Sequence, residues 1–194
     1  DSTFELPESA LWSDTSVDGN HLYYDNDTDY GAYYTWYTAT AGTGTEALTE
    51  GNAASSICPK GWRLPSGGTN GEFKALYDKF TDTIWATSSG KNGRWLGASN
   101  ASAGGAFFSA AGYFRPEDNS LSYTNIDAHY WSSTSVNANQ AYDLYFIQSK
   151  TLPANPDSKY RGYSIRCLAP ASSTDFPDRF DEKDVEVVAV RVAP

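Results

Sequence analysis

Two cysteines are the residues of this 194-residue chain whose chemistry is easiest to define. Cys58 lies in the rigid segment SSICPKGWRLPSGG, and Cys167 lies far downstream in GYSIRCLAP. A disulfide between them would close a loop of 109 residue steps (167 − 58), to which chain-entropy models assign about 4–5 kcal/mol. Two free thiols and a two-cysteine metal site are the alternatives. His21 and His129 have no ligand-like spacing to the cysteines, which disfavours the metal site.

Three aspartates alternate along the segment DNDTDYG. Asp25, Asp27 and Asp29 are spaced as the first three ligands of a calcium loop are. An EF-hand would also need Gly at position six and Glu at position twelve, where this chain has Tyr30 and Trp36. The pattern excludes an EF-hand and leaves two interpretations, an irregular calcium loop and a solvated β-turn.

A serine, a histidine and an aspartate lie near one another around the segment AHYWSSTS. Asp127, His129 and Ser132 have the group types of a hydrolytic triad, but neighbours on one strand do not supply triad geometry. The chain has no G-x-S-x-G, H-E-x-x-H or P-loop motif. It also lacks the WND motif of calcium-dependent lectins, to which ANPDS (154–158) has only a distant likeness. We therefore expect no enzyme activity and no cofactor, apart from the calcium alternative.

Acidic side chains are concentrated at the start of the chain. The net charge is −10, and residues 1–57 hold ten of the 24 acidic residues and no Lys or Arg. Nucleic acids and anionic lipids require a basic surface, so neither is an expected partner. No apolar run approaches the roughly 18–20 residues that span a bilayer, so no membrane insertion is expected in this segment. The abundance of Tyr, Trp, Asn, Ser and Thr, without any Met, resembles an extracellular protein.

One helix is expected directly after the cysteine-containing segment. Thr69 and Glu72 form a T-x-x-E capping box. The apolar residues that follow recur at helical spacing: Phe73, Leu76, Tyr77 and Phe80. The pattern predicts a helix over residues 70–80.

Short strands are expected over most of the remaining chain. Residues 30–40 are rich in aromatic and β-branched side chains, which favours a strand. In the segment AYDLYFI, Tyr142, Leu144 and Phe146 alternate with Asp143 and Tyr145, which predicts a strand with one face in water. The strands follow one another too closely for helical crossovers, so the sheets should be mostly antiparallel. The fold class is therefore α+β, with one clear helix and long loops.

The C-terminal segment differs in character from the rest. Residues 171–194 form a polar, proline-containing linker followed by the valine-rich run VEVVAVRVAP. Such a strand must pair with something, because a free apolar strand is an aggregation edge. Pairing within its own domain is expected. The alternatives are a junction with a following domain and a homo-oligomer joined through this strand.

Four motifs occur in an order that resembles a known family. ICPKGWRLPS followed by a helix, YWSSTSVNANQAYDLYF, the closing GYSIRCL and the earlier YGAYYTWYTATAG are similar to the Fibrobacter succinogenes major paralogous domain over about residues 20–169. The resemblance implies a domain similar to the C-type lectin fold, over residues 1–170. It also implies a bacterial protein that is secreted or displayed at the cell surface.

The resemblance also implies roles for the cysteine-containing segment. The two cysteines of the family match Cys58 and Cys167, which implies a disulfide between the start of the helix and the closing strand. The prolines and glycine of CPKGWRLP would restrict the turn around Cys58, and Trp62 would pack into the core. The segment is thus expected to be structural rather than catalytic.

Two functional relatives follow from the same resemblance. The variable proteins of diversity-generating retroelements have a similar layout of WSS motif, variable run and closing strand, although this chain is only modestly rich in Asn and adds Cys167. The formylglycine-generating enzymes share the RLP-then-helix corner, but both cysteines here match the stapling positions rather than their active-site cysteines.

Exposed Tyr and Asn/Gln side chains in the late loops suit recognition of a ligand, because Tyr gives contact area at low entropic cost and amides adapt their hydrogen bonds. The candidate ligand-binding residues are Tyr130, Asn137, Asn139, Gln140, Tyr142, Tyr145, Asn155 and Tyr160. We expect a non-catalytic adhesin or receptor-type domain that binds a surface protein or glycan. The alternatives are a structural subunit of a surface filament or layer, and a retroelement-diversified binding protein.

Overall fold

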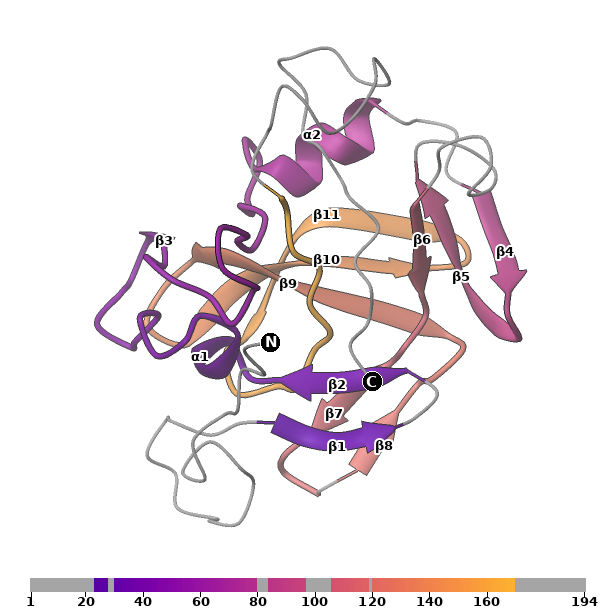
Figure 1. Ribbon diagram of the computed structural model, residues 1–194, viewed down its shortest axis with the longest axis horizontal. Coiled ribbons are helices and arrows are strands. Elements are labelled where there is room, and N and C mark those ends of the chain that lie inside the picture. Colours follow the sequence, from indigo (N-terminus) through magenta and orange to yellow (C-terminus); the bar gives the residue numbers. More distant parts are fainter. Residues whose placement is uncertain (1–22, 28–29, 80–83, 97–105, 119, 170–194) are drawn as a thin grey trace.

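The computed structural model describes residues 23–27, 30–79, 84–96, 106–118 and 120–169, with the backbone alone described for 23–27. Within these ranges every pair of named strands is antiparallel (Figure 1). The central sheet has the order β11-β10-β9-β3, formed by Lys150–Ser158, Gln140–Ile147, Asp127–Ser135 and Gly51–Asn52. A second sheet has the order β4-β5-β6, formed by Ile84–Ser88, Lys91–Leu96 and Ala106–Ser109.

Two further hairpins and two helices complete the described part. The hairpins are β1-β2 (Tyr23–Asp27 and Gly31–Tyr34) and β7-β8 (Tyr113–Arg115 and Ser120–Ser122). The helices are α1 (Trp36–Ala39) and α2 (Glu72–Lys79). This composition agrees with the predicted α+β class and antiparallel sheets, and the lectin-like fold stays a prediction. The C-terminal segment 171–194 and its alternatives lie outside the described residues.

The main core lies between the central sheet, α2 and the β4–β6 sheet, which Figure 1 shows above and to the right of the central strands. Tyr130 on β9 is opposite Leu144 on β10, and Ala128 is opposite Phe146. Side chains directly opposite in an antiparallel pair share a face, so these four form one apolar surface. Phe73, Leu76, Leu96 and Phe108 pack against it.

The strand predicted over residues 30–40 is half right. β2 ends at Tyr34, and the next residues form the short helix α1. Thr35 has extended backbone angles and its hydroxyl accepts a hydrogen bond from the backbone N–H of Thr38, which is the geometry of an N-cap. The β-branched residues that suggested a strand are therefore used to cap and terminate a helix.

The predicted helix is confirmed, but its capping residue is different. α2 begins at Glu72, and Thr69 is exposed. The backbone N–H of Glu72 donates to Ser66 Oγ at 3.0 Å, and the Glu72 carboxylate accepts from the Ser66 N–H at 2.8 Å. The five-residue turn between them brings the two residues together, so this reciprocal cap spans six positions and not the three of a capping box.

The alternation along β10 is confirmed, but its second face is not in water. Asp143 is fully buried because the closing segment packs on that side of the sheet. Tyr163 lies there, with its ring 4.3 Å from those of both His129 and Trp131. Both faces of the central sheet are thus covered near its middle.

Candidate functional site

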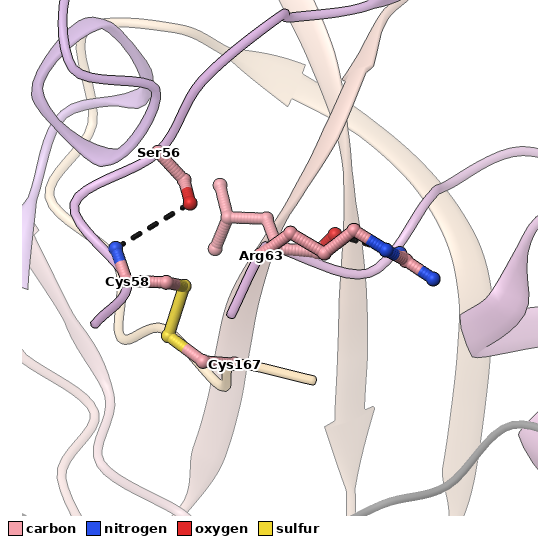
Figure 2. The surroundings of a disulfide bond; sticks show 5 residues. Ser56, Cys58, Arg63 and Cys167 are labelled. Atoms are coloured by element: carbon pink, nitrogen blue, oxygen red, sulfur yellow. Dashed lines mark hydrogen bonds between the residues drawn. A yellow bond between two sulfur atoms is a disulfide. The ribbon is translucent and has the colours of Figure 1, made fainter. Parts of the chain in front are cut away.

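The disulfide between Cys58 and Cys167 is formed, as the family resemblance implied (Figure 2). Its Cα atoms are 5.8 Å apart, and Cys167 is 4 % exposed. Beside it, the Arg63 N–H donates to the Leu168 carbonyl at 3.1 Å and the Leu168 N–H returns a bond of 2.7 Å to Arg63. The disulfide and this pair of backbone hydrogen bonds together hold the segment of Cys58 and Arg63 against the closing segment of Cys167 and Leu168.

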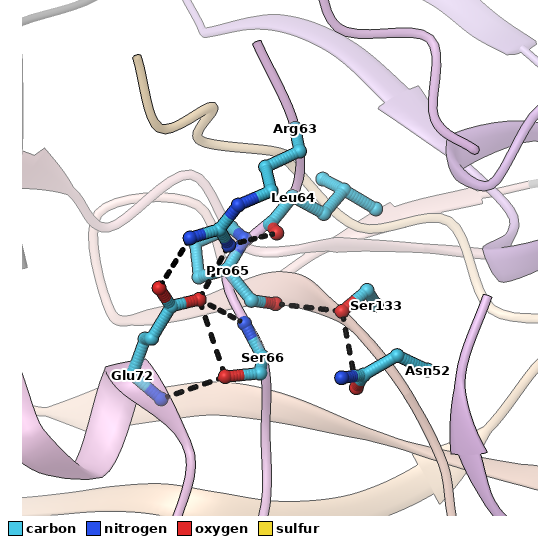
Figure 3. Close-up of polar contacts among 7 residues, drawn as sticks. All are labelled: Asn52, Arg63, Leu64, Pro65, Ser66, Glu72 and Ser133. Atoms are coloured by element: carbon cyan, nitrogen blue, oxygen red, sulfur yellow. Dashed lines mark hydrogen bonds and ion pairs between the residues drawn. The ribbon is translucent and has the colours of Figure 1, made fainter. Parts of the chain in front are cut away.

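A polar network begins at Arg63 on the other side of the motif (Figure 3). The Arg63 guanidinium donates two hydrogen bonds to the Glu72 carboxylate, at 2.6 and 2.5 Å. Burial by itself raises the pKa of Glu72, but the bonds from Arg63 and Ser66 outweigh it and the net pKa lies below its ordinary value. Glu72 is therefore an ionised structural anchor that fixes the start of α2 and one wall of the space beside it.

The WSST segment on β9 forms a second wall of this network. Ser133 donates from its backbone N–H to the Pro65 carbonyl at 2.8 Å, and its hydroxyl reaches Asn52 Oδ1 at 3.3 Å. Ser132 Oγ donates to the Tyr142 carbonyl at 2.6 Å. These serines therefore act as turn and packing residues, and Ser132 bonds to a backbone carbonyl instead of to His129.

A groove of about 640 Å³ lies where the two motif segments meet. Residues 52–56 and 58–64 form its long walls, and Ser66, Glu72 and Ser133 close the rest. Trp62, expected in the core, is only half-buried and lines this groove. The cysteine-containing segment is thus both a structural corner and a wall of this groove.

Several hydrogen-bond donors of the groove have no partner within the described residues. Lys60 is exposed, and neither its ammonium nor the Trp62 indole N–H makes a hydrogen bond there. Asn52 uses its carbonyl oxygen to accept from Ser133 and Thr134, which leaves its amide N–H groups unpaired. The side-chain carbonyl of Asn52 and both carboxylate oxygens of Glu72, by contrast, already accept hydrogen bonds. The groove therefore offers an aromatic face and a set of unpaired donors.

Sequence reasoning missed these groove residues for different reasons. Lys60 and Trp62 lie inside the family motif, for which the sequence predicts only a structural role. Asn52 had no signal in the sequence, since β3 is only two residues long and pairs with β9 through Asn52 opposite Thr134.

The predicted ligand-binding residues do not form one surface. Asn137 and Asn139 are exposed at the β9–β10 turn, where the Asn137 side chain accepts from the backbone N–H groups of Asn139 and Gln140 at 2.9 Å and so shapes the turn. Tyr160 donates to Glu46 from a different part of the domain. Tyr130 is 2 % exposed and its hydroxyl donates to the Ser109 carbonyl, so burial in the core removes it from the exposed set.

Three further residues of this set lie along β10 and β11. Tyr142 packs over Gly67 and Gly68, where an added Cβ at Gly67 would lie 2.5 Å from Tyr142 Cβ. On the opposite face, Tyr145 is half-buried beside His129, and Asn155 donates to Asp143 at 2.8 Å. The alternation of the strand thus separates Tyr142 from Tyr145 and Asn155.

The aspartates of the proposed calcium loop are only partly described. The backbone of Asp25 and Asp27 belongs to β1, while their side chains and the whole of Asp29 lie outside the described residues. In the part of the chain that the structure describes, no group of three His, Cys, Asp or Glu side chains has metal-binding geometry. Calcium binding by this segment stays a prediction.

Comparison with known proteins identifies the family. The profile of the Fibrobacter succinogenes major domain matches residues 8–169, which is most of the chain. The chain therefore belongs to the Fibrobacter succinogenes major domain family, and the match begins earlier than the motifs alone suggested. Searches of curated proteins and of solved structures each gave no significant match. None of the helices described here is long and apolar enough to cross a bilayer.

Proposed function

We propose that this domain is a non-catalytic binding module that acts outside the cell and takes a surface glycan or protein ligand in the groove beside the disulfide. The observation that carries the proposal is the half-exposed Trp62 lying among unpaired donors in a groove of about 640 Å³. Ligand pockets combine aromatic walls with a few oriented polar groups. The structural disulfide supports an oxidising, extracellular location.

The groove chemistry favours a hydroxyl-rich ligand. An indole gives both an apolar face and an N–H donor, and Asn52 and Lys60 add donors that ligand oxygens can satisfy. The groove is held open by the Arg63–Glu72 pair and the Ser133–Pro65 bond, so little conformational freedom is lost when a ligand enters. A glycan is therefore the favoured ligand, and a protein surface is the alternative.

The proposal is tested by binding of the labelled domain to an array that contains bacterial and host glycans together with surface proteins. Trp62→Ala should abolish any specific signal, whereas Trp95→Ala should retain it. Trp95 is a matched control because it is also half-buried but packs against Phe107 in the β4–β6 sheet. Thermal melts verify that both variants are folded. Equal loss of signal in both variants, or in neither, would contradict a ligand site in the groove.

A further inference from the structure

A second cluster lies on the other side of the central sheet from the main core. Tyr145 on β10 is opposite His129 on β9, and Ile147 is opposite Asp127, so all four side chains share a face. Ala128 and Tyr130, which alternate with them along β9, point to the opposite face and belong to the main core. The Asp127 cluster is formed by strand residues that the groove does not use.

Aromatic rings surround this cluster. The centre of the His129 ring lies 4.3 Å from that of Tyr163 and 4.7 Å from that of Tyr145, and the Tyr113 ring, 5.3 Å away, is nearly perpendicular to it. Tyr123 stacks on Tyr113 at 5.8 Å and is 53 % exposed. The rings of Tyr123, Tyr113, His129 and Tyr145 thus form a row that extends from the surface to the sheet.

Three carboxylates lie in or beside this row, and two of them have partners. Asp143 accepts from His129 Nδ1 at 2.6 Å and from Asn155. Asp157 accepts from the Tyr163 hydroxyl at 2.6 Å and lies 3.6 Å from Arg161 Nε. Each of these two buried or half-buried acids is therefore satisfied.

The third carboxylate has no hydrogen-bond partner among the described residues. Asp127 is 8 % exposed, and neither of its oxygens accepts a hydrogen bond from any described residue. Burial raises the pKa of Asp127 to about 6, with His129 opposing and Asp143 adding to the rise. A buried carboxylate oxygen without a hydrogen bond, here Oδ1, is costly. In native proteins such a group is accounted for by water, an ion, strain or a functional role.

The charges around Asp127 favour a cation. Of the three carboxylates, Asp157 lies 3.6 Å from Arg161 Nε, and the Arg161 guanidinium lies 4.9 Å from the centre of the Tyr113 ring. Lys150 is in the same cross-strand row as Asp127, but it is exposed, two strands away, and forms no ion pair. Electron-rich tyrosine faces next to an unpaired carboxylate are the recognition elements of organic cations. Arg161 shows that this side of the domain already holds one such group.

We propose that the Asp127 cluster binds an organic cation, an alkylammonium or guanidinium group, with Asp127 as its counter-ion and Tyr123 and Tyr145 as its aromatic walls. This site is separate from the groove and does not depend on the function proposed for it. A lysine or arginine side chain of a partner protein and a free polyamine share this chemistry.

The test is an NMR titration of the tyrosine ring signals of the whole domain at pH 7.5. The probes are N-acetyl-lysine methylamide, N-acetyl-arginine methylamide and spermidine, and the neutral control is N-acetyl-norleucine methylamide. Saturable shifts of the Tyr123 and Tyr145 signals are expected with the cations alone, and the probe that binds most tightly identifies the source. Asp127→Asn should weaken binding about ten-fold or more, which corresponds to loss of one charged contact, while Glu117→Gln on the exposed β7–β8 turn should not.

Any one of four outcomes would overturn the proposal. Norleucine could bind as well as lysine, Asp127→Asn could leave the affinity unchanged, or no probe could give a saturable shift. A 13C titration of the Asp127 carboxyl gives an independent readout in the same sample. If Lys150→Gln shifts the pKa of Asp127 in that titration, Lys150 of the chain itself is the counter-ion, and the site has no vacancy for a ligand.

Discussion

Removal of the disulfide by Cys58→Ala with Cys167→Ala should destabilise the domain mainly through its unfolded state. The bond joins residues 109 positions apart, and the chain-entropy relation gives about 4.8 kcal/mol for a loop of that size at 25 °C. In the folded state the Arg63–Leu168 backbone pair still holds the corner in place. Residual structure in the unfolded chain reduces the effect, so the expected loss in the free energy of unfolding is about 3–5 kcal/mol.

The assay is urea unfolding followed by tryptophan fluorescence. Without the cross-link the unfolded chain is more expanded and exposes more surface, so the m-value should increase as the midpoint falls. Reduced wild-type protein is the control and should match the double variant. A loss below about 1 kcal/mol with an unchanged m-value would refute the reasoning. It would mean that the disulfide does not restrict the conformations of the unfolded chain.

Three other substitutions test the structural account. Gly67→Ala should cost at least about 2 kcal/mol, because its Cβ would lie 2.5 Å from Tyr142 Cβ; a neutral result in urea unfolding would be inconsistent with this close packing. Glu72→Gln should cost about 1 kcal/mol at pH 7, a modest value because Arg63 is largely exposed. The lowered pKa means that this difference is present above the ordinary pKa of Glu and disappears as the pH falls below about 4; a difference that persists at pH 3 would exclude the ion pair as its source. Asp127→Asn should stabilise the ligand-free domain by about 1–3 kcal/mol above pH 6, because an acid with a raised pKa opposes folding when ionised, and should have no effect below about pH 4. A pH series of unfolding curves checks this sign, and destabilisation at pH 7.5 would contradict it.

The sequence was sufficient to predict features set by local pattern. The spacing of Phe73 and Leu76 located α2, and the alternation along β10 located a strand. The family motifs located the disulfide. Features that depend on distant segments were wrong or missed. Asp143 is buried because Tyr163, twenty positions later, covers its side of the sheet, and periodicity along one strand contains no information about what packs on it.

The candidate site was harder to predict for the same reason. Asn52, Trp62 and Ser133 meet in the groove only after β3 pairs with β9 and the disulfide fixes the motif segment. The Tyr and Asn residues of the late strands were chosen by type, and the structure separates them because successive strand residues point to opposite faces. Residue type predicted surface chemistry at Asn137 and Asn139, but it could not distinguish them from the buried Tyr130.

The most direct test of the binding proposal is 19F NMR of the domain labelled with 5-fluorotryptophan. The chain has six tryptophans, and the Trp62 signal is assigned from the spectrum of Trp62→Phe. On titration with the strongest ligand from the array, the Trp62 signal should shift saturably while the signal of the fully buried Trp131 stays unchanged. Saturable binding that leaves the Trp62 signal in place would show that the ligand binds elsewhere, and the assignment of function to the groove would be wrong.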